Sequence, residues 1–392
     1  MTGPLGNQVK PLTNRCFASL APMPTLSDVV GLLEGWYPPD TADEHDAVGL
    51  VHGDPAQAVG KVLFAVDPTI EVAREAASWG ADLLVVHHPL FLRGVHGFAE
   101  TTPKGRTLAT LVRAGCALFT AHTNADRAEP GVSDAMAAAL GLTNVRPLRT
   151  EGTPLDKLTV YVPEADAERV RGALSEAGAG RIGDYESASF TSPGEGRFRP
   201  LEGAHPTVGR VGDLEVVGEA RIEVVLDRRR RGDVIAAMLV AHPYETPAWD
   251  VVELADGGTA STGAGRIGEV GPTTLRDFAA YVARALPQTA RGVLVSGDPD
   301  RVVRRVAVAG GAGDFLLGDA LGSGADVFVT SDLRHHPASE FVEKGGPALV
   351  DVAHWAAEWT WLPHVQARLV AALDTVEIRV STLCTDAWTF RA

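Results

Sequence analysis

Short apolar runs alternate with amphipathic stretches from about residue 26 to residue 140. The runs predict buried strands, because they are short and rich in Val, Leu and Phe, and the stretches between them predict helices. The predicted elements are strands 61–66 (KVLFAV), 82–86 (DLLVV) and 116–121 (CALFTA), with helices 69–79 and 104–114 between them. This alternation indicates a parallel sheet with helices on both faces.

The same alternation returns after residue 304. The predicted strands here are 306–309, 326–330 and 348–352, each followed by a helix, at about 314–321, 336–344 and 355–373 respectively. Both second strands open with Gly-Ala-Asp, and both third strands follow a Gly-x-Ala-Leu motif. A His stands just past each third strand, with an acidic residue four positions later. The chain is therefore predicted to hold two copies of one α/β unit.

The segment between the two copies has a different order. It reads strand, helix, strand, strand, helix, strand, which is the order of a ferredoxin-like split βαβ unit. We interpret it as an inserted domain, with the Gly-rich run 257–265 as the returning linker. The predicted organisation is a flexible tail at 1–24, a duplicated α/β domain formed by 25–150 with 262–392, and the insert at 151–261.

The composition narrows the classes of function. Thirty-five basic and fifty acidic residues in 392 give a net charge of −15, which does not favour binding to nucleic acid or to an anionic membrane. No apolar run approaches the length of a membrane span, and the first 24 residues lack the apolar core of a signal peptide. Cys16, Cys116 and Cys384 are too far apart for a Cys-x-x-Cys metal site or a disulfide framework. A cytoplasmic protein is expected.

Side chains that bind metals follow the predicted strands. The group consists of His87, His88, Asp126, His354 and Glu358. Ligands collect at the carboxyl ends of parallel strands. Adjacent residues at a strand end point in different directions, so His87 and His88 suit two separate ions, whereas a His-x-x-x-Glu pair shares one helix face. These imidazoles and carboxylates predict two divalent ions, with zinc, manganese, iron or cobalt as candidates.

Each of these motifs also has a purely structural interpretation. A His-His-Pro strand end can be a capped turn with partly solvated imidazoles, and His-x-x-x-Glu can be a solvated helix face. His122 can orient the Asp126 loop through a hydrogen bond instead of binding metal. We favour the metal site because five ligand-type residues occur at equivalent strand ends of the two copies.

Two further motifs carry candidate residues. SDLRHHPA (331–338) places Asp332, His335 and His336 at the position that matches the paired histidines of the first copy. These residues could orient metal ligands or exchange protons with a substrate, or they could play neither part.

HPYETPAWD (242–250) groups His242, Tyr244 and Glu245, either as an ordered turn or as a lid over the metal cleft.

Three weaker signals remain. DRRRRGD (227–233) suggests a solvated turn or a phosphate site, and AGGAGDFLLGDA (309–320) a phosphate loop or a tight turn. Asp67, at the end of the first strand, could cap the following helix.

With these residues in view, the chain resembles the Nif-three-like family of dinuclear-metal-centre proteins, the GTP cyclohydrolase I type 2 homologues. The resemblance rests on VVHHPLF, AHTNAD, HPYETPAWD, DVFVTSD and DVAHWAAEW, and covers nearly the whole chain from about residue 26. The chain departs from the family pattern at Ala353-His354-Trp355, where Gly-His-Tyr is usual. His336 takes the place of the His in the family's Gly-Asp-hydrophobic-Lys-Tyr-His pattern.

The resemblance implies a metal pair held by His87, His88, Asp126, His354 and Glu358. It implies a ring-shaped homohexamer whose metal sites face an internal cavity. It also implies that the insert is similar to PII and CutA-type trimers, so the insert could add trimer contacts.

Two classes of function remain open. In the first, two ions lower the pKa of a bridging water and polarise a bond in a nucleotide or small heterocycle. Glu358 or Asp126 would hold the bridge, and His336 or Glu245 would move protons. The family's name suggests ring-opening hydrolysis of GTP, although the sequence contains no guanine-binding motif. In the second class, the hexamer senses, stores or delivers metal, or is a regulatory scaffold. Five protein ligands over two ions leave room for water, which favours the hydrolase.

Overall fold

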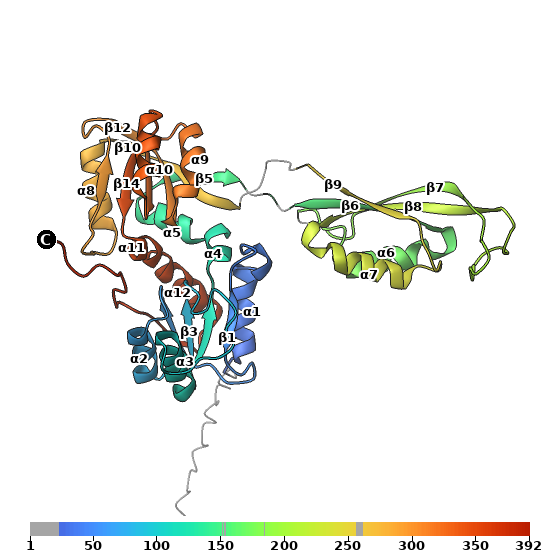
Figure 1. Cartoon of the computed structure of the whole chain (residues 1–392), viewed down its shortest axis with the longest axis horizontal. Helices are drawn as coiled ribbons and strands as arrows, with labels where there is room; N and C mark the ends of the chain where they lie inside the picture. The colour runs from blue at the N-terminus through green and yellow to red at the C-terminus, as the bar shows by residue number, and fades with distance from the viewer. Residues whose placement is uncertain (1–22, 151, 153, 184, 256–261) are drawn as a thin grey trace, which may run out of the picture. The chain divides into compact units, whose positions relative to one another are not determined.

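The computed structural model describes residues 23–150, 152, 154–183, 185–255 and 262–392. Most of the predicted tail, Cys16 and residues 257–261 of the predicted linker lie outside this part of the chain. The described chain divides into two compact units (Figure 1). The first contains 23–36, 47–121 and 362–383, and the second contains 37–46, 122–361 and 384–392.

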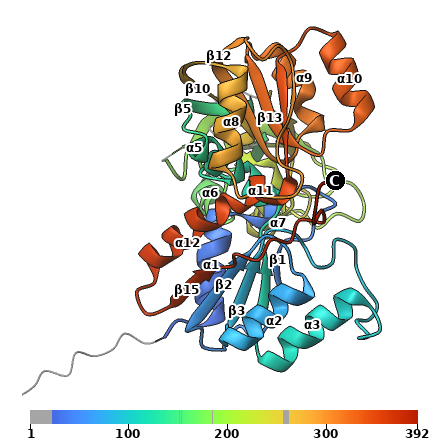
Figure 2. The ribbon, with the colours of Figure 1, turned by 90° about the vertical axis from the view of Figure 1, so that its left-hand side faces the viewer.

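The first unit is built on a five-stranded sheet in the order β1-β4-β3-β2-β15. All its neighbouring strands run parallel except β1, which is antiparallel to β4. Its strands are β1 (Gly49–His52), β2 (Lys61–Ala65), β3 (Leu83–Val86), β4 (Ala117–Thr120) and β15 (Glu377–Val380), and its helices are α1 (Leu26–Trp36), α2 (Ile70–Trp79), α3 (Pro103–Ala114) and α12 (Trp361–Ala372). Helices α2 and α3 lie side by side over one face of the sheet (Figure 2).

The limits of α2 and α3 follow from their end residues. Thr69 and Thr102 accept a hydrogen bond from the backbone amide three residues later, which satisfies one of the free amides of each first turn. Gly80 and Gly115 end the helices in the left-handed conformation, with φ values of 72° and 68°. The apolar faces of both helices pack on the buried side chains of β2, β3 and β4.

The second unit has a six-stranded sheet in the order β11-β14-β13-β12-β10-β5. The three central strands β12, β13 and β14 are parallel, and the outer pairings are antiparallel. Its strands are β5 (Thr143–Thr150), β10 (Gly263–Thr274), β11 (Leu294–Ser296), β12 (Val302–Ala312), β13 (Val327–Ser331) and β14 (Ala348–Val352). Its helices are α4 (Thr123–Arg127), α5 (Val132–Ala139), α8 (Leu275–Ala285), α9 (Leu317–Gly322), α10 (His335–Glu343) and α11 (His354–Trp359), with 3-10 turns η1 (Pro39–Thr41) and η4 (Asp314–Leu316).

The two sheets repeat the same contacts at matching positions. Asp82 Oδ2 accepts from the amides of Gly60 and Lys61 at 2.8 and 2.9 Å. Asp326 Oδ2 accepts in the same way from the amides of Arg304 and Arg305, both at 2.8 Å. Each aspartate thus ties the start of one parallel strand to the start of the next.

Within the second unit, residues 154–255 form a sheet of their own, separate from the six-stranded sheet. Four strands pair in the order β7-β8-β6-β9, all antiparallel, and helices α6 and α7 cover one side of the sheet (Figure 1). The elements are β6 (Leu155–Pro163), η2 (Glu164–Asp166), α6 (Ala167–Glu176), β7 (Ser189–Phe198), β8 (Glu215–Asp227), η3 (Arg228–Arg230), α7 (Arg231–Ala241) and β9 (Trp249–Glu253). Apolar side chains of β6, β8, α6 and α7 form their own core.

The structure changes one predicted element and adds several. The predicted helix 355–373 is two helices, α11 and α12, separated at Thr360. Pro363 accounts for the break, because proline has no amide hydrogen and fits only in the first turn of a helix. Sequence reasoning missed β1, β5, β10, β11 and β15, whose runs are short, Gly-rich or exposed on alternate residues. No helix in the described ranges is long and apolar enough to cross a membrane.

Candidate metal centre

The first unit presents His87 and His88 at the end of β3, a fully buried strand. His87 is itself buried, and its Nδ1 lies 2.8 Å from the carbonyl oxygen of Ala121. Because a carbonyl only accepts, Nδ1 of His87 donates and Nε2 is left as the ring atom with a lone pair. His88 Nδ1 lies 2.7 Å from Asp67 Oδ1. The two imidazoles offer nitrogen atoms within 4.8 Å of each other.

Asp67 therefore has a different role from the predicted helix cap. The residue that caps α2 is Thr69, whose hydroxyl accepts from the amide of Val72 at 3.3 Å. Asp67 instead follows β2 in the chain, and its side chain holds the ring of His88, which follows the neighbouring strand β3. Carboxylates in this position fix the ring orientation of metal-binding histidines and raise their basicity.

The second unit presents His354 and Glu358 on one face of α11, directly after β14. His354 Nε2 lies 2.7 Å from Glu358 Oε1, and His354 Nδ1 lies 2.7 Å from Asp332 Oδ2. The side chain of Glu358 is 4% exposed. Gly311 has a φ of +70°, and a Cβ there would lie 2.5 Å from Glu358 Oε1. Strand β12 therefore needs glycine where it passes this carboxylate.

His122 directly precedes α4, and Asp126 lies within that helix. His122 Nδ1 lies 2.9 Å from Asp46 Oδ1, and Thr123 donates to the second oxygen of the same carboxylate from its amide at 3.1 Å. The ring of His122 is thus oriented by Asp46, in the way that His88 and His354 are oriented by their aspartates.

One pocket of the second unit collects four of the predicted residues. It has a volume of about 210 Å³, and the predicted residues that line it are His122, Asp126, His354 and Glu358. His122 and Asp126 come after β4 in the chain, and His354 and Glu358 come after β14. Gly310 and Gly311 form part of its wall, as residues of β12 rather than of a phosphate loop before a helix.

The remaining predicted residues lie elsewhere. His335 and His336 begin α10, and His336 lines a different pocket of the second unit with side chains of α9 and α10. His242 is buried; its Nε2 lies 2.9 Å from the carbonyl oxygen of Tyr161, and its Nδ1 accepts from the amide of Tyr244 at 3.1 Å. Burial lowers the pKa of His242, which keeps it neutral in this turn. Tyr244 and Glu245 line a pocket within residues 154–255.

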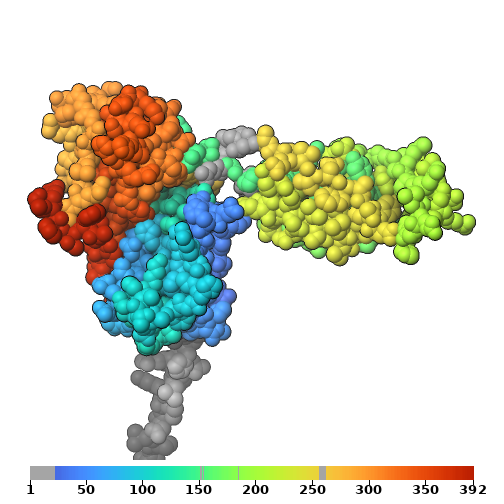
Figure 3. All heavy atoms as spheres, viewed as in Figure 1, coloured from blue at the N-terminus to red at the C-terminus, as the bar shows by residue number. Residues whose placement is uncertain are grey.

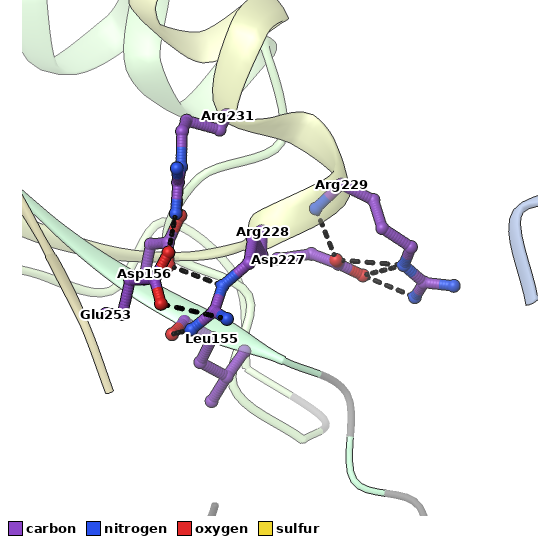
Figure 4. Close-up of polar contacts among 7 residues, drawn as sticks. All are labelled: Leu155, Asp156, Asp227, Arg228, Arg229, Arg231 and Glu253. Atoms are coloured by element: carbon purple, nitrogen blue, oxygen red, sulfur yellow. Dashed lines mark hydrogen bonds and ion pairs between the residues drawn. The ribbon is translucent and has the colours of Figure 1, made fainter. Parts of the chain in front are cut away.

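The arginine run 228–231 is occupied by internal contacts. Arg228 and Arg231 both bind Asp156, at 2.9 and 2.6 Å, and Arg229 binds Asp227 (Figure 4). Arg230 donates to the carbonyl of Ala177 at 3.2 Å. These partners favour the predicted turn over the phosphate site.

Sequence reasoning missed Asp46 as a partner of a candidate ligand. Asp67 had a detectable signal, since it follows a predicted strand next to the one that ends in His87 and His88. Asp46 lies in a loop with no periodic pattern, and only the tertiary fold brings it to His122.

The donor set fits a divalent metal of the zinc, manganese, iron or cobalt kind. It consists of imidazoles and carboxylates, and three of the imidazoles are oriented by an aspartate. Cys116 is no candidate ligand, because burial raises the pKa of its thiol to about 12 and it lies in the core beside β4.

These features define an α/β protein whose strand ends carry His and Glu groups able to bind a metal ion. Residues 24–387 match the family described as Duf34/NIF3 (NGG1p interacting factor 3), and the chain belongs to this family. Its curated relatives include the GTP cyclohydrolase 1 type 2 homolog of Mycobacterium tuberculosis, which is 48% identical over 93% of this chain and 96% of its own length. The homolog of the same name from Halalkalibacterium halodurans is 38% identical, over 92% of this chain and 98% of its own.

Solved structures share the fold. The Bacillus cereus protein related to NIF3 is 38% identical, with a TM-score of 0.71 over 95% of this chain and 100% of that chain. A Staphylococcus aureus protein is 29% identical, with a TM-score of 0.73 over 94% of this chain and 99% of that chain.

Proposed function

We propose that the protein binds a pair of divalent metal ions through His87, His88, Asp126, His354 and Glu358. The observation that carries the proposal is the orientation of the imidazoles. His87, His88 and His354 each place Nδ1 within 2.7–2.8 Å of an oxygen of their own unit, which fixes the orientation of the ring and directs Nε2 away from that oxygen. In His354, Nε2 lies 2.7 Å from Glu358 Oε1, the other proposed ligand on this helix face. A solvated surface histidine has no need of such a partner.

We further propose that the protein is a hydrolase of a nucleotide or small heterocycle, in line with the name of its relatives, GTP cyclohydrolase 1 type 2 homolog. Divalent ions at such a site supply Lewis acidity and lower the pKa of bound water. Glu358, shielded from solvent beside His354, would hold a proton at Oε1 or Oε2 during the reaction. Asp332 would keep the ring of His354 in place.

The assembly is part of the same proposal. A homohexamer in the cytoplasm, with metal sites toward an internal cavity, follows from the family resemblance. The strand order β7-β8-β6-β9 with two helices on one side supports a ferredoxin-like, PII- or CutA-like insert at 151–261 that could add trimer contacts. Light scattering of the full chain checks the hexamer, and a monomeric mass would exclude it.

The test of the metal proposal measures metal content and turnover together. The full chain is stripped, reloaded with zinc, manganese, iron or cobalt, and assayed on GTP and other nucleotides. His88→Ala and Glu358→Ala should lose bound metal and turnover. His364→Ala removes an exposed imidazole of α12 and should change neither quantity.

Two more variants separate proton transfer from metal binding. If His336 or Glu245 moves a proton, His336→Ala or Glu245→Ala should lower turnover and leave the metal content unchanged. Two ions per chain without turnover on any nucleotide would favour a metal-sensing, metal-storage or scaffold protein. Less than one ion per chain under all loading conditions would exclude the metal site itself.

A further inference from the structure

A second pocket lies wholly within residues 154–255, whose surface is drawn in green to yellow in Figure 3. It has a volume of about 240 Å³ and is enclosed by the end of β7, the connection that follows β7, strand β8 and the turn 244–248. The side chains that matter for its chemistry are Tyr161, Phe198, Arg199, Glu219, Tyr244 and Glu245. None of these residues belongs to the proposed metal site except Glu245, which is only a candidate for proton transfer there.

The pocket is held in shape by bonds between the two connections that enclose it. Thr207 donates from its hydroxyl to the carbonyl of Pro243 at 2.7 Å, and Glu245 Oε1 accepts from the amide of His205 at 3.0 Å. His242 fastens the turn to β6 through the carbonyl of Tyr161. The pocket is therefore formed before any ligand arrives, which reduces the entropy cost of binding.

Gly196 leaves space for a carboxylate at the pocket wall. A Cβ at Gly196 would lie 2.1 Å from Glu219 Oε2 and 2.9 Å from Oε1, so the carboxylate of Glu219 lies over the backbone of β7. Glycine inside a strand often marks such a close approach. Both Gly196 and Glu219 line the pocket.

Aromatic rings stand beside this carboxylate. Phe198 and Tyr244 pack edge to face, with ring centroids 5.7 Å apart. The hydroxyl oxygen of Tyr244 is buried beside the carboxylate of Glu219. Burial, with the nearby charge of Glu219, raises the pKa of Tyr244 to about 12, so the phenol stays neutral.

The charges around the pocket favour a cation. Glu219 and Glu245 contribute two carboxylates, whereas the guanidinium of Arg197 is paired with Glu195 at 2.7 Å. Arg199 is exposed at the rim. A cation is attracted both to carboxylates and to the faces of aromatic rings.

We propose that this pocket binds a small organic cation, an amine or guanidinium compound, whose N–H groups donate to Glu219 and whose charge lies against the rings of Phe198 and Tyr244. Apart from Glu245, the side chains in this proposal are not among the proposed metal ligands or proton-transfer residues. The pocket gives residues 154–255 a ligand-binding role of their own.

The test uses agmatine and spermidine as probes, with isothermal titration calorimetry on the full chain. At least one of them should bind the unaltered protein. Glu219→Gln should weaken its binding by about tenfold or more, because a charge-assisted hydrogen bond is lost. Gly196→Ala should weaken it as well, because the added methyl displaces the carboxylate. Glu223→Gln is the matched control: Glu223 is on the same strand, pairs with Lys157 and does not line the pocket.

The outcomes separate this site from the metal site. Glu219→Gln and Glu223→Gln should keep the metal content and melting temperature of the unaltered chain. Failure of both probes to bind the unaltered protein would overturn the proposal. Equal binding of the probe by the unaltered protein and by folded Glu219→Gln would overturn it too.

Discussion

The two α/β sheets agree at the amino ends of their strands and differ at the carboxyl ends. Asp82 and Asp326 accept the same pair of backbone amides, and Gly53 and Gly297 pass the same position of the third strand. At the other end, β3 leads into two histidines, whereas β13 ends at Ser331 and leads into Asp332.

This difference shows that the residues shared by the two sheets and the candidate functional residues lie at opposite ends of the strands. At the amino ends, both sheets carry the same backbone contacts. The carboxyl ends are free to differ, because side chains there project beyond the sheet. The second copy thus offers Asp332 as a partner for His354, while the first copy offers imidazoles that are held by Asp67 and a carbonyl.

The largest expected effect concerns a contact that the first sheet lacks. Arg266 on β10 is buried and binds Asp134 at 2.6 and 2.7 Å and the carbonyls of Ala128, Gly263 and Gly265. Arg266→Met should lower the free energy of unfolding by about 3–5 kcal/mol, because it leaves a charge and three carbonyls without their partner. Urea unfolding followed by tryptophan fluorescence measures this loss. Arg276→Met, at an exposed position, should cost far less; an equal cost would show that the contacts of Arg266 are unimportant.

The next largest expected effect concerns Gly53 and Gly297, which occupy corresponding positions in the two sheets. Gly53 has a φ of +146°, and a Cβ there would lie 2.6 Å from the Cβ of Ala117. Gly53→Ala should destabilise the protein by about 3 kcal/mol through backbone strain and overpacking. Gly297→Ala, with φ +133° and a Cβ 2.9 Å from that of Ala348, should destabilise it slightly less in the same urea experiment. A neutral Gly53→Ala would contradict the close packing of the first sheet.

The carboxyl ends can be compared through the aspartates that orient the histidines. If the proposed metal site is correct, Asp67→Asn and Asp332→Asn should each weaken metal affinity by about 10- to 100-fold, because the rings lose a partner that fixes and polarises them. Competition with a chromogenic chelator measures the affinity. Asp314→Asn removes a surface carboxylate that pairs with Arg334 and should leave the affinity unchanged. Unchanged affinity in both test variants would exclude the positioning role.

The smallest effect contrasts residues 154–255 with the two sheets. Hydrogen bonds from Arg231, and then Arg228, lower the pKa of Asp156 below its usual 3.8 (Figure 4). A carboxyl with a lowered pKa in the folded state stabilises the fold above the unfolded pKa and loses this contribution as the pH falls through the folded pKa. Asp156→Asn should therefore cost about 1–2 kcal/mol at pH 7 and progressively less below pH 3.8. Thermal unfolding of the two proteins over this range checks it; a constant difference would contradict the linkage.

The central strands and helices could be read from the sequence because their signals are local. Strands β2, β3 and β4 are continuous apolar runs, and α2 and α3 carry a cap at each end. The outer strands could not be read in this way. Strand β5 has mostly exposed residues, and its position depends on hydrogen bonds to β10 more than 100 residues later.

The same distinction between local and long-range information applies to the candidate site. The sequence by itself determined which residues carry imidazole and carboxylate groups at strand ends, since strand periodicity and residue type are local properties. Only the tertiary structure decided that His122 and Asp126 line one pocket with His354 and Glu358, and that His336 lines another. It also decided that Asp46 and Asp67 orient histidines, because such contacts depend on packing between segments far apart in the chain.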